Sequence, residues 1–196
     1  MKIVVGLGNP GKEYAETPHN VGFAVIEQLA AGFDCAMRRS LRFNARIGHV
    51  TVAPEPLLLV EPLTFMNRSG DAVAAILGYR KLSTSDMVVV LDDADLDIGW
   101  LRIRARGSSG GHRGLDSIIR STGGDAFARV RIGVGRGRRR DDLVEHLLSR
   151  FSRQEWQQIQ PEITRAADAV RCVLESGAEA AMNRFNGPPS DETATA

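Results

Sequence analysis

Residues 1–20 read MKIVVGLGNPGKEYAETPHN, and this stretch determines how the rest of the chain is interpreted. It begins with an apolar, β-branched run, Lys2 to Leu7, of the kind found in a parallel strand that is covered on both faces. The segment GNPG at residues 8–11 predicts a turn, and a polar loop follows before a helical pattern begins at Val21. Asn9 and His19 therefore lie between the carboxyl end of a strand and its helix, where ligands bind in open α/β sheets.

The glycines at residues 6–11 also match the GxGxxG pattern of dinucleotide-binding loops. In that motif the third glycine opens a helix whose N-terminus holds the pyrophosphate. Here residues 12–17 resemble a loop, Pro18 delays the helix, and no second strand ends in an acidic residue at the expected distance. The sequence thus disfavours a dinucleotide site. A need for tight turning explains Gly8 and Gly11, but it does not explain Asn9 and His19.

The composition indicates one domain. The chain has 196 residues, of which 43% are hydrophobic, enough for one ample core. We expect a domain over residues 1–186 and a disordered polar tail over residues 187–196. Cys35 and Cys172 are the only cysteines and have no metal-site spacing, which is typical of a reducing cytoplasm. No apolar stretch has the length of a secretion signal or a membrane span.

The net charge of +1 hides an uneven distribution. Residues 102–140 contain eleven arginines, no lysine and two acids, a balance of +9 that leaves −8 for the rest of the chain. These arginines surround a glycine-rich loop at residues 107–114, and we interpret them as one face that binds a polyanion. The alternative is a set of ordinary solvated strand and helix faces.

The rest of the chain alternates between strand and helix patterns. We predict further strands at residues 42–52, 57–60, 87–91, 100–106 and 128–135. We predict helices at residues 21–32, 69–79, 115–119, 141–151, 152–176 and 178–186, with Gly32 just past the end of the first and Pro161 as a kink or break. The expected class is α/β, a single three-layer α/β/α domain with a twisted mixed, mainly parallel sheet.

Four polar residues are expected to meet at one edge of this sheet. Asn9 and His19 follow the first strand, Asn67 follows strand 57–60, and Asp92 ends strand 87–91. A histidine oriented by a buried carboxylate is a general base, and Asn side chains bind a peptide group or stabilise a developing oxyanion. No nucleophilic serine or thiol accompanies them. The set favours base-activated water attacking a carbonyl, and the neighbouring basic face suggests that the leaving group belongs to a nucleic acid.

These residues also have simpler interpretations. His19 could cap a helix, Asn67 could bond its own loop, and Asp92 could cap a turn. One of the neighbouring acids, Asp93, Asp95 or Asp97, could take the role of Asp92. The acidic cluster as a whole could instead bind Mg²⁺.

The other histidines are less suited to be the base. His112 starts a helix in the second glycine loop and is the main rival to His19, although no carboxylate is obviously tied to it. His49 and His146 lie on strand and helix patterns and are interpreted as structural.

Five segments, taken together, resemble one family. They are VGLGNPGKEYAETPHNVGF (5–23), EPLTFMNRSG (61–70), VLDDADLDIG (90–99), GSSGGHRGLDSI (107–118) and RVRIGVGR (129–136). In this order and spacing they resemble bacterial-type peptidyl-tRNA hydrolase, over nearly the whole chain to about Asn186. The resemblance implies a monomeric, cytoplasmic α/β hydrolase of translation that needs no cofactor and no metal. It implies cleavage of the ester between a peptide and the 3′-terminal ribose of tRNA, with the acceptor stem and 3′ end of peptidyl-tRNA as partner and no membrane involved.

Carried over by position, the resemblance makes His19 the base that activates water, held in its basic form by Asp92. It implies that Asn9 recognises the peptide group beside the scissile ester, which would spare aminoacyl-tRNA with its free amino group. Asn67 would hold substrate and water. The resemblance further implies a cleft at the tRNA end lined by Tyr14, Phe65 and Met66, and phosphates received by the helix start after SSGGH with Arg102, Arg104 and Arg131.

One position departs from the family pattern. Arg113 stands where the family commonly has an Asn that is associated with binding the acceptor end and the water. Arginine cannot accept a hydrogen bond as Asn does, but it binds phosphate bidentately. We therefore expect Arg113 to bind the tRNA backbone while ester hydrolysis is retained. The alternative functions are an RNA-binding protein on the same scaffold without hydrolysis, and a nucleotide-dependent enzyme that rests on the GxGxxG match alone.

Overall fold

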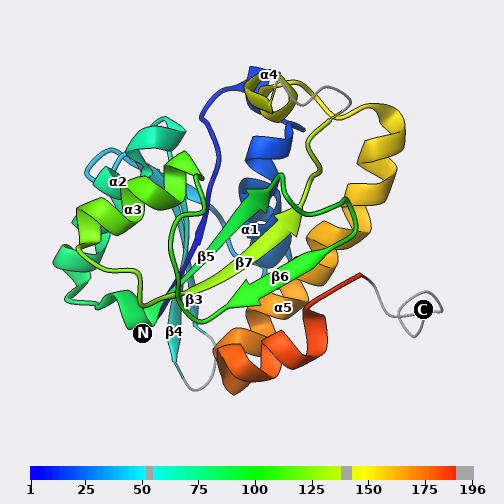
Figure 1. Ribbon diagram of the computed structural model, residues 1–196. Coiled ribbons are helices and arrows are strands. Elements are labelled where there is room, and N and C mark those ends of the chain that lie inside the picture. The colour runs from blue at the N-terminus through cyan, green and yellow to red at the C-terminus, as the bar shows by residue number, and fades with distance from the viewer. Residues whose placement is uncertain (52–54, 138–142, 189–196) are drawn as a thin grey trace.

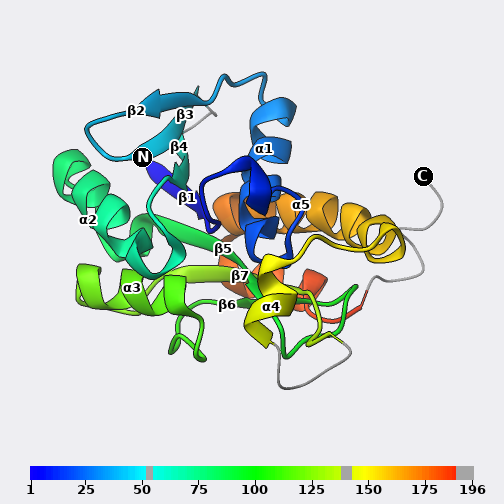
Figure 2. The same ribbon diagram turned by 90° about the horizontal axis from the view of Figure 1, so that it is seen from above.

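The structure is a computed structural model that describes residues 1–51, 55–137 and 143–188. At its centre is a seven-stranded sheet in the order β2-β3-β4-β1-β5-β7-β6 (Figures 1 and 2). The inner strands β4, β1, β5 and β7 are parallel, while β3 runs antiparallel to β4 and β2, and β6 to β7. The strands are β1 Lys2–Gly6, β2 Arg38–Ser40, β3 Ala45–Thr51, β4 Pro56–Pro62, β5 Met87–Asp93, β6 Leu101–Arg104 and β7 Ala128–Gly133. The predicted α/β class with a mixed, mainly parallel sheet is confirmed.

Helices cover both faces of the sheet and so form three layers (Figure 2). One face is covered by α1 Val21–Gly32 and α5 Arg153–Phe185, and the other by α2 Ser69–Arg80 and α3 Arg113–Thr122. A shorter helix, α4 Leu143–Leu148, lies beyond the carboxyl ends of the parallel strands (Figure 1). The 3-10 helices are η1 Lys12–Tyr14, η2 Pro18–Asn20, η3 Met66–Arg68 and η4 Thr84–Asp86.

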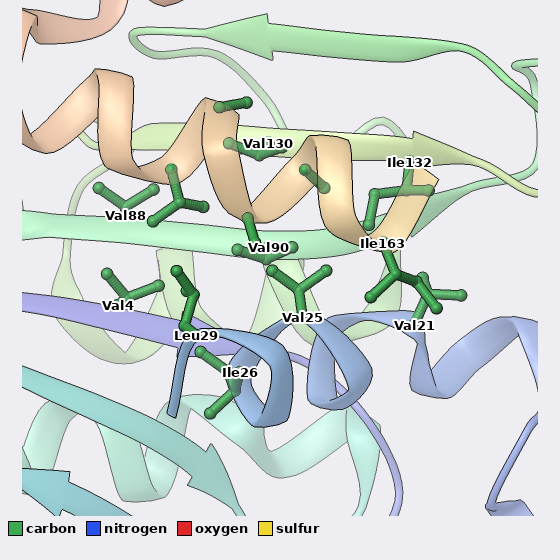
Figure 3. Close-up of a cluster of buried hydrophobic side chains, with 14 of the residues drawn as sticks. Val4, Val21, Val25, Ile26, Leu29, Val88, Val90, Val130, Ile132 and Ile163 are labelled. Atoms are coloured by element: carbon green, nitrogen blue, oxygen red, sulfur yellow. The ribbon is translucent and has the colours of Figure 1, made fainter. Parts of the chain in front are cut away.

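Each face of the sheet has its own cluster of buried apolar side chains. Val4 of β1 belongs to the cluster between the sheet and helices α1 and α5, where it lies near Leu29 and Val88 (Figure 3). Its neighbours Ile3 and Val5 belong to the opposite cluster, with residues of α2 and α3. Both faces of β1 are therefore dry, which is why its sequence is a continuous apolar run.

The edges of the sheet differ from the sequence prediction. The edge strand β2 is exposed and contains no apolar residue, so no hydrophobic pattern marked it. At the other edge β6 is shorter than expected but alternates as predicted, with Leu101 and Ile103 buried and Arg102 and Arg104 exposed. Helix α1 includes Gly32, and the chain turns at Asp34, whose φ is 48°.

Helix α5 is interrupted at Gly177, where φ is 86° and ψ is 166°. This matches the predicted boundary between two helices, whereas Pro161 lies within helical backbone and does not break it. Gly187, after the helix, exchanges two backbone hydrogen bonds with Leu101 of β6. The expected tail lies mostly outside the described residues, from 189 onward, as do the first residues of the helix predicted from Asp141.

Among the described helices, none combines the length and the apolar composition needed to cross a bilayer.

Candidate active site

The site begins with the close contact of β1 and α1. A Cβ atom on Gly6 would lie 2.2 Å from the carbonyl oxygen of Gly22, so only glycine lets the two elements approach this closely. Because β1 and β5 are parallel and pair Gly6 with Val90, the loop after β1 lies over the end of β5. This arrangement brings His19, in η2, to Asp92, the penultimate residue of β5.

His19 and Asp92 form a buried pair. The His19 Nδ1 atom lies 2.9 Å from both carboxylate oxygens of Asp92. The two side chains are only 12% and 2% exposed. Because the carboxylate accepts, Nδ1 holds the proton, and Nε2 keeps a free lone pair on a ring that lines the cavity. This is the tautomer that a general base requires.

A second histidine binds the same carboxylate. The Nε2 atom of His112 lies 2.9 Å from Asp92 Oδ1, and the two imidazole rings are 5.1 Å apart. The expectation that no carboxylate is tied to His112 is therefore wrong. No sequence pattern revealed this contact, because the β5 end and the start of α3 meet only through the tertiary fold.

The position of Asp92 between the two histidines controls its ionisation. Burial by itself would raise the pKa of this carboxyl group. Electrostatic attraction to the His112 and His19 rings, together with the hydrogen bonds that these rings donate, outweighs burial and holds the pKa of Asp92 well below its usual range. Asp92 is thus a carboxylate throughout the neutral range, as an acceptor for two imidazole N–H groups must be.

The orientation of Asn9 is set by the backbone. Asn9, 7% exposed, accepts a hydrogen bond from the Met66 N–H at its Oδ1 atom, at 2.9 Å. The Asn20 side chain bonds both the N–H and the carbonyl of Asn9, at 2.9 and 3.0 Å. No described residue accepts from the Nδ2 group of Asn9, so this donor is available at the cavity that Asn9 lines. Asn20 is thus a supporting residue that no pattern in the sequence indicates.

These side chains border a cavity of about 780 Å³. The cavity gathers all four residues predicted to converge, together with Tyr14, Phe65, Met66 and Arg113. Phe65 is 60% exposed, whereas Met66 is buried. The opposite wall was not anticipated: it is the apolar side of α4, contributed by Leu143, Val144, Leu147 and Leu148. The only signal for it was the apolar spacing within LVEHLL.

The acidic cluster after β5 is distributed among different partners. Asp92 binds the histidines, Asp93 pairs with Arg131 at 3.1 Å, and Asp95 accepts from Arg136 Nε at 2.8 Å. These arginines and imidazoles already satisfy the three carboxylates. The cluster is therefore not arranged as the Mg²⁺ site considered from sequence.

His19, Asp92 and His112 place three ligand-type atoms within 4.8 Å of one another, but their protonation does not suit a metal. His112 Nδ1 accepts from the Leu115 N–H at 3.2 Å, so the ring proton must be on Nε2. The nitrogens that face Asp92 are thus N–H donors and offer no lone pair to a cation.

The basic residues divide into two groups. Arg102 and Arg104 are exposed on β6, and Arg131 on β7 lies opposite Arg102 and lines the cavity. Arg129, in contrast, is 1% exposed. Its guanidinium donates to the carbonyls of Gly107, Ser108, Asp125 and Phe127. It supports the glycine loop and does not belong to the anion-binding face with which the sequence grouped it.

The first glycine loop does not form a dinucleotide-binding turn. Gly11 is followed by the short helix η1, and α1 begins only at Val21. The loop therefore presents no long helix N-terminus to a pyrophosphate at the third glycine.

Fold and site together define a class of protein: an α/β enzyme with an imidazole hydrogen-bonded to a buried carboxylate and a cavity at the carboxyl edge of the sheet. The sequence matches the family model for peptidyl-tRNA hydrolase over residues 3–194. The chain belongs to the peptidyl-tRNA hydrolase family, a family of hydrolases, as its five motifs indicated.

Relatives and solved structures agree with this assignment. Peptidyl-tRNA hydrolase of Syntrophomonas wolfei is 46% identical over 186 residues, which cover 95% of this chain and 100% of the relative. Peptidyl-tRNA hydrolase of Clostridium perfringens is 42% identical, over 95% of this chain and 98% of the relative. The crystal structure of peptidyl-tRNA hydrolase from Acinetobacter baumannii matches with a TM-score of 0.90 at 31% identity and covers 97% of each chain.

Proposed function

We propose that this protein hydrolyses the ester between a peptide, or an N-blocked amino acid, and the 3′-terminal ribose of tRNA, which frees the tRNA for reuse. Membership of the peptidyl-tRNA hydrolase family supports this reaction. The observation that carries the mechanism is the hydrogen bond from His19 Nδ1 to Asp92, which leaves His19 Nε2 as a free base at the cavity.

In the proposed reaction, His19 Nε2 takes a proton from a water molecule as its oxygen attacks the ester carbonyl carbon. A tetrahedral intermediate forms, and the bond from its carbon to the ribose 3′ oxygen then breaks. The proton passes from His19 to the departing oxygen, which restores the base. The products are the peptide acid and tRNA with a free 3′ hydroxyl. The ionised Asp92 stabilises the transient imidazolium.

Asn9 is proposed to select substrates that carry a peptide bond. Because its Oδ1 atom is held by the Met66 N–H, the group it offers to the substrate is the Nδ2 donor. That donor suits the carbonyl oxygen of the peptide group next to the scissile ester. An unblocked aminoacyl ester has an ammonium group there and no such carbonyl. Asn67, on η3 at the same cavity, is proposed to hold substrate and water.

The tRNA is proposed to lie along the face that runs from the cavity to β6. Arg102 and Arg131 are cross-strand neighbours beside the cavity. Arg131 is already paired with Asp93, whereas the exposed Arg102 and Arg104 have no ion-pair partner among the described residues. This favours phosphate binding at Arg102, Arg104 and Arg131. Tyr14, Phe65 and Met66 are proposed to receive the terminal nucleotide.

Arg113 extends this proposed tRNA face into the cavity. It is exposed, lines the cavity at the first turn of α3, and has no ion-pair partner among the described residues. A free guanidinium at this place can bind a backbone phosphate near the 3′ end.

We also propose that the protein acts in the cytoplasm as a monomer that binds the acceptor stem and 3′ end of peptidyl-tRNA. Light scattering of the purified protein during size-exclusion chromatography tests this point, and a dimer mass would contradict it.

The decisive assay is release of N-acetyl-amino acid from N-acetyl-aminoacyl-tRNA. We expect wild type to release it, to spare unblocked aminoacyl-tRNA, and to lose activity by about 100-fold or more in His19→Ala. His49→Ala is the matched control, because His49 is an exposed histidine on β3 away from the cavity. Binding of tRNA by wild type without any release would instead support an RNA-binding protein without hydrolysis.

A further inference from the structure

We propose that His112 is a positioning residue for the proposed reaction. It is a neutral imidazole with its proton held on Nε2, and it shares the Asp92 carboxylate with His19. This sharing limits how strongly Asp92 stabilises the imidazolium form of His19. The inference rests on the proposed function only in giving His19 the role of base. The state of His112 itself follows from its contacts.

The backbone of α3 locks the protonation of His112. Its Nδ1 atom accepts the Leu115 N–H and thereby caps the first turn of the helix. A proton on Nδ1 would break this cap and face another N–H group. The cation would also lie at the positive end of the helix dipole, which disfavours it. His112 therefore keeps one proton, on Nε2, and donates it to Asp92.

This donation changes what Asp92 can offer to His19. Asp92 is 2% exposed, so water does little to satisfy its charge. Its Oδ1 atom accepts from both histidines, whereas Oδ2 accepts from His19 alone. Without the His112 donor, more of the buried negative charge would act on His19. The protonated imidazolium of His19 would then be more stable, and it cannot take a proton from water.

Other charged groups around His19 come from several elements, but none of them donates to Asp92. Asp93 is paired with Arg131, and Asp95 with Arg136. His146, on α4, faces the Val134 carbonyl. The other titratable or charged groups on the elements that border the site are Lys12, Glu13 and Tyr14 of η1, Arg68 of η3, Arg113, Asp116 and Arg120 of α3, and Glu145 of α4, and no hydrogen bond joins any of them to Asp92. His112 is thus the described group that can adjust the Asp92–His19 pair directly.

The variant His112→Asn separates the two contacts of this residue. Asn is a preferred N-cap, so its side-chain oxygen can replace Nδ1 as acceptor of the Leu115 N–H. Its side chain is shorter than imidazole and leaves Asp92 Oδ1 without the second donor. We expect the acid limb of the kcat/KM profile to move to higher pH by roughly one unit, with activity at alkaline pH largely retained. His49→Asn serves as control and should leave the profile in place.

Two kinetic outcomes would overturn the proposal. If His112→Asn lowers kcat/KM by the same factor at every pH, the residue only holds the loop in place. If the profile does not move and the rate does not change, the shared hydrogen bond has no influence on His19.

A second measurement does not depend on hydrolysis and therefore separates this inference from the proposed function. In ¹⁵N-labelled wild type, the signals missing from His112→Asn identify the ring nitrogens of His112. We expect a protonated Nε2 and a bare Nδ1 from about pH 6 to pH 8. A proton on Nδ1, or a doubly protonated ring in this range, would contradict the proposed protonation of His112 even if the enzyme hydrolyses peptidyl-tRNA as proposed.

Discussion

At the residue scale, backbone N–H groups decide what the polar side chains of the site offer. The Met66 N–H occupies the oxygen of Asn9 and leaves its amide donor, and the Leu115 N–H occupies Nδ1 of His112 and leaves its Nε2 donor. In both cases one hydrogen bond fixes the orientation of a side chain with two chemically different ends. The site therefore presents defined donors without relying on substrate to orient them.

Asn9→Asp tests this at Asn9. The new side chain keeps an oxygen for the Met66 N–H but loses the donor that we assign to the substrate peptide group. We expect kcat/KM for N-acetyl-aminoacyl-tRNA to fall by about 10–100-fold, the cost of one unmade hydrogen bond to a buried polar group. Asn186→Asp is the matched control, because Asn186 Oδ1 also accepts a backbone N–H, from Ile103, away from the cavity. Unchanged kinetics in Asn9→Asp would exclude a donor role.

At the element scale, buried strands were predicted well and edge or loop contacts were not. β1 and β5 have two dry faces, so their residues must be apolar and their pattern is visible locally. β2 is formed by pairing with β3, and the residue types of Arg38–Ser40 do not distinguish a strand from a loop. The charge count of residues 102–140 groups Arg129 with the arginines of a polyanion-binding face, but the glycine loop covers Arg129 and buries it.

Strands β3 and β4 and helix α1 are joined by a charge cluster in which Glu61 is buried and its partners are partly exposed. Arg46 of β3 binds Glu61 of β4 at 2.8 Å and also Glu27 of α1. Glu61 is 1% exposed, and its Oε1 atom has no hydrogen-bond partner among the described residues. Burial outweighs the attraction of Arg46 and, with repulsion from Glu27, raises the pKa of Glu61 to about 7.

This raised pKa predicts how stability depends on pH. The folded chain holds the Glu61 proton more tightly than the unfolded chain, whose Glu pKa is about 4.3. The contribution of Glu61 to stability is complete below that value and is lost as pH rises through about 7. We expect Glu61→Gln to flatten this loss in urea unfolding measured between about pH 5 and pH 8. Glu27→Gln is the control, because Glu27 is a half-exposed partner of the same arginine, and this variant should keep most of the change of unfolding free energy with pH. If Glu61→Gln keeps the full wild-type change, the loss of stability does not come from Glu61.

At the scale of the whole molecule, both edges of the sheet carry exposed arginines, but only the β6 edge adjoins the cavity. Arg102 and Arg104 on β6 adjoin the cavity through Arg131, whereas the arginines of β2 lie at the opposite edge. Arg102 of β6 comes to lie beside Arg131 of β7 only because β6 folds back antiparallel beside β7. One end of a polyanion bound along these arginines would lie close to the His19–Asp92 pair.

Salt dependence of tRNA binding tests this surface. Each phosphate contact releases counterions, so replacing one arginine should reduce the slope of log affinity against log salt by about 1. We expect this for Arg102→Ala and for Arg104→Ala, measured on the His19→Ala protein to prevent turnover. Arg39→Ala, an exposed arginine on β2, is the control and should leave the slope unchanged. Equal slopes for all three variants would place the tRNA elsewhere.

The sequence by itself determined the order of the elements, the buried strands and the positions of Asn9, His19 and Asp92 at strand ends, because periodicity and strand ends are properties of neighbouring residues. Only the tertiary structure decided that Asp92 serves two histidines and that Met66 orients Asn9. These contacts join residues 73, 20 and 57 positions apart. They depend on how loops pack across the sheet edge, and no local pattern of side chains encodes that packing.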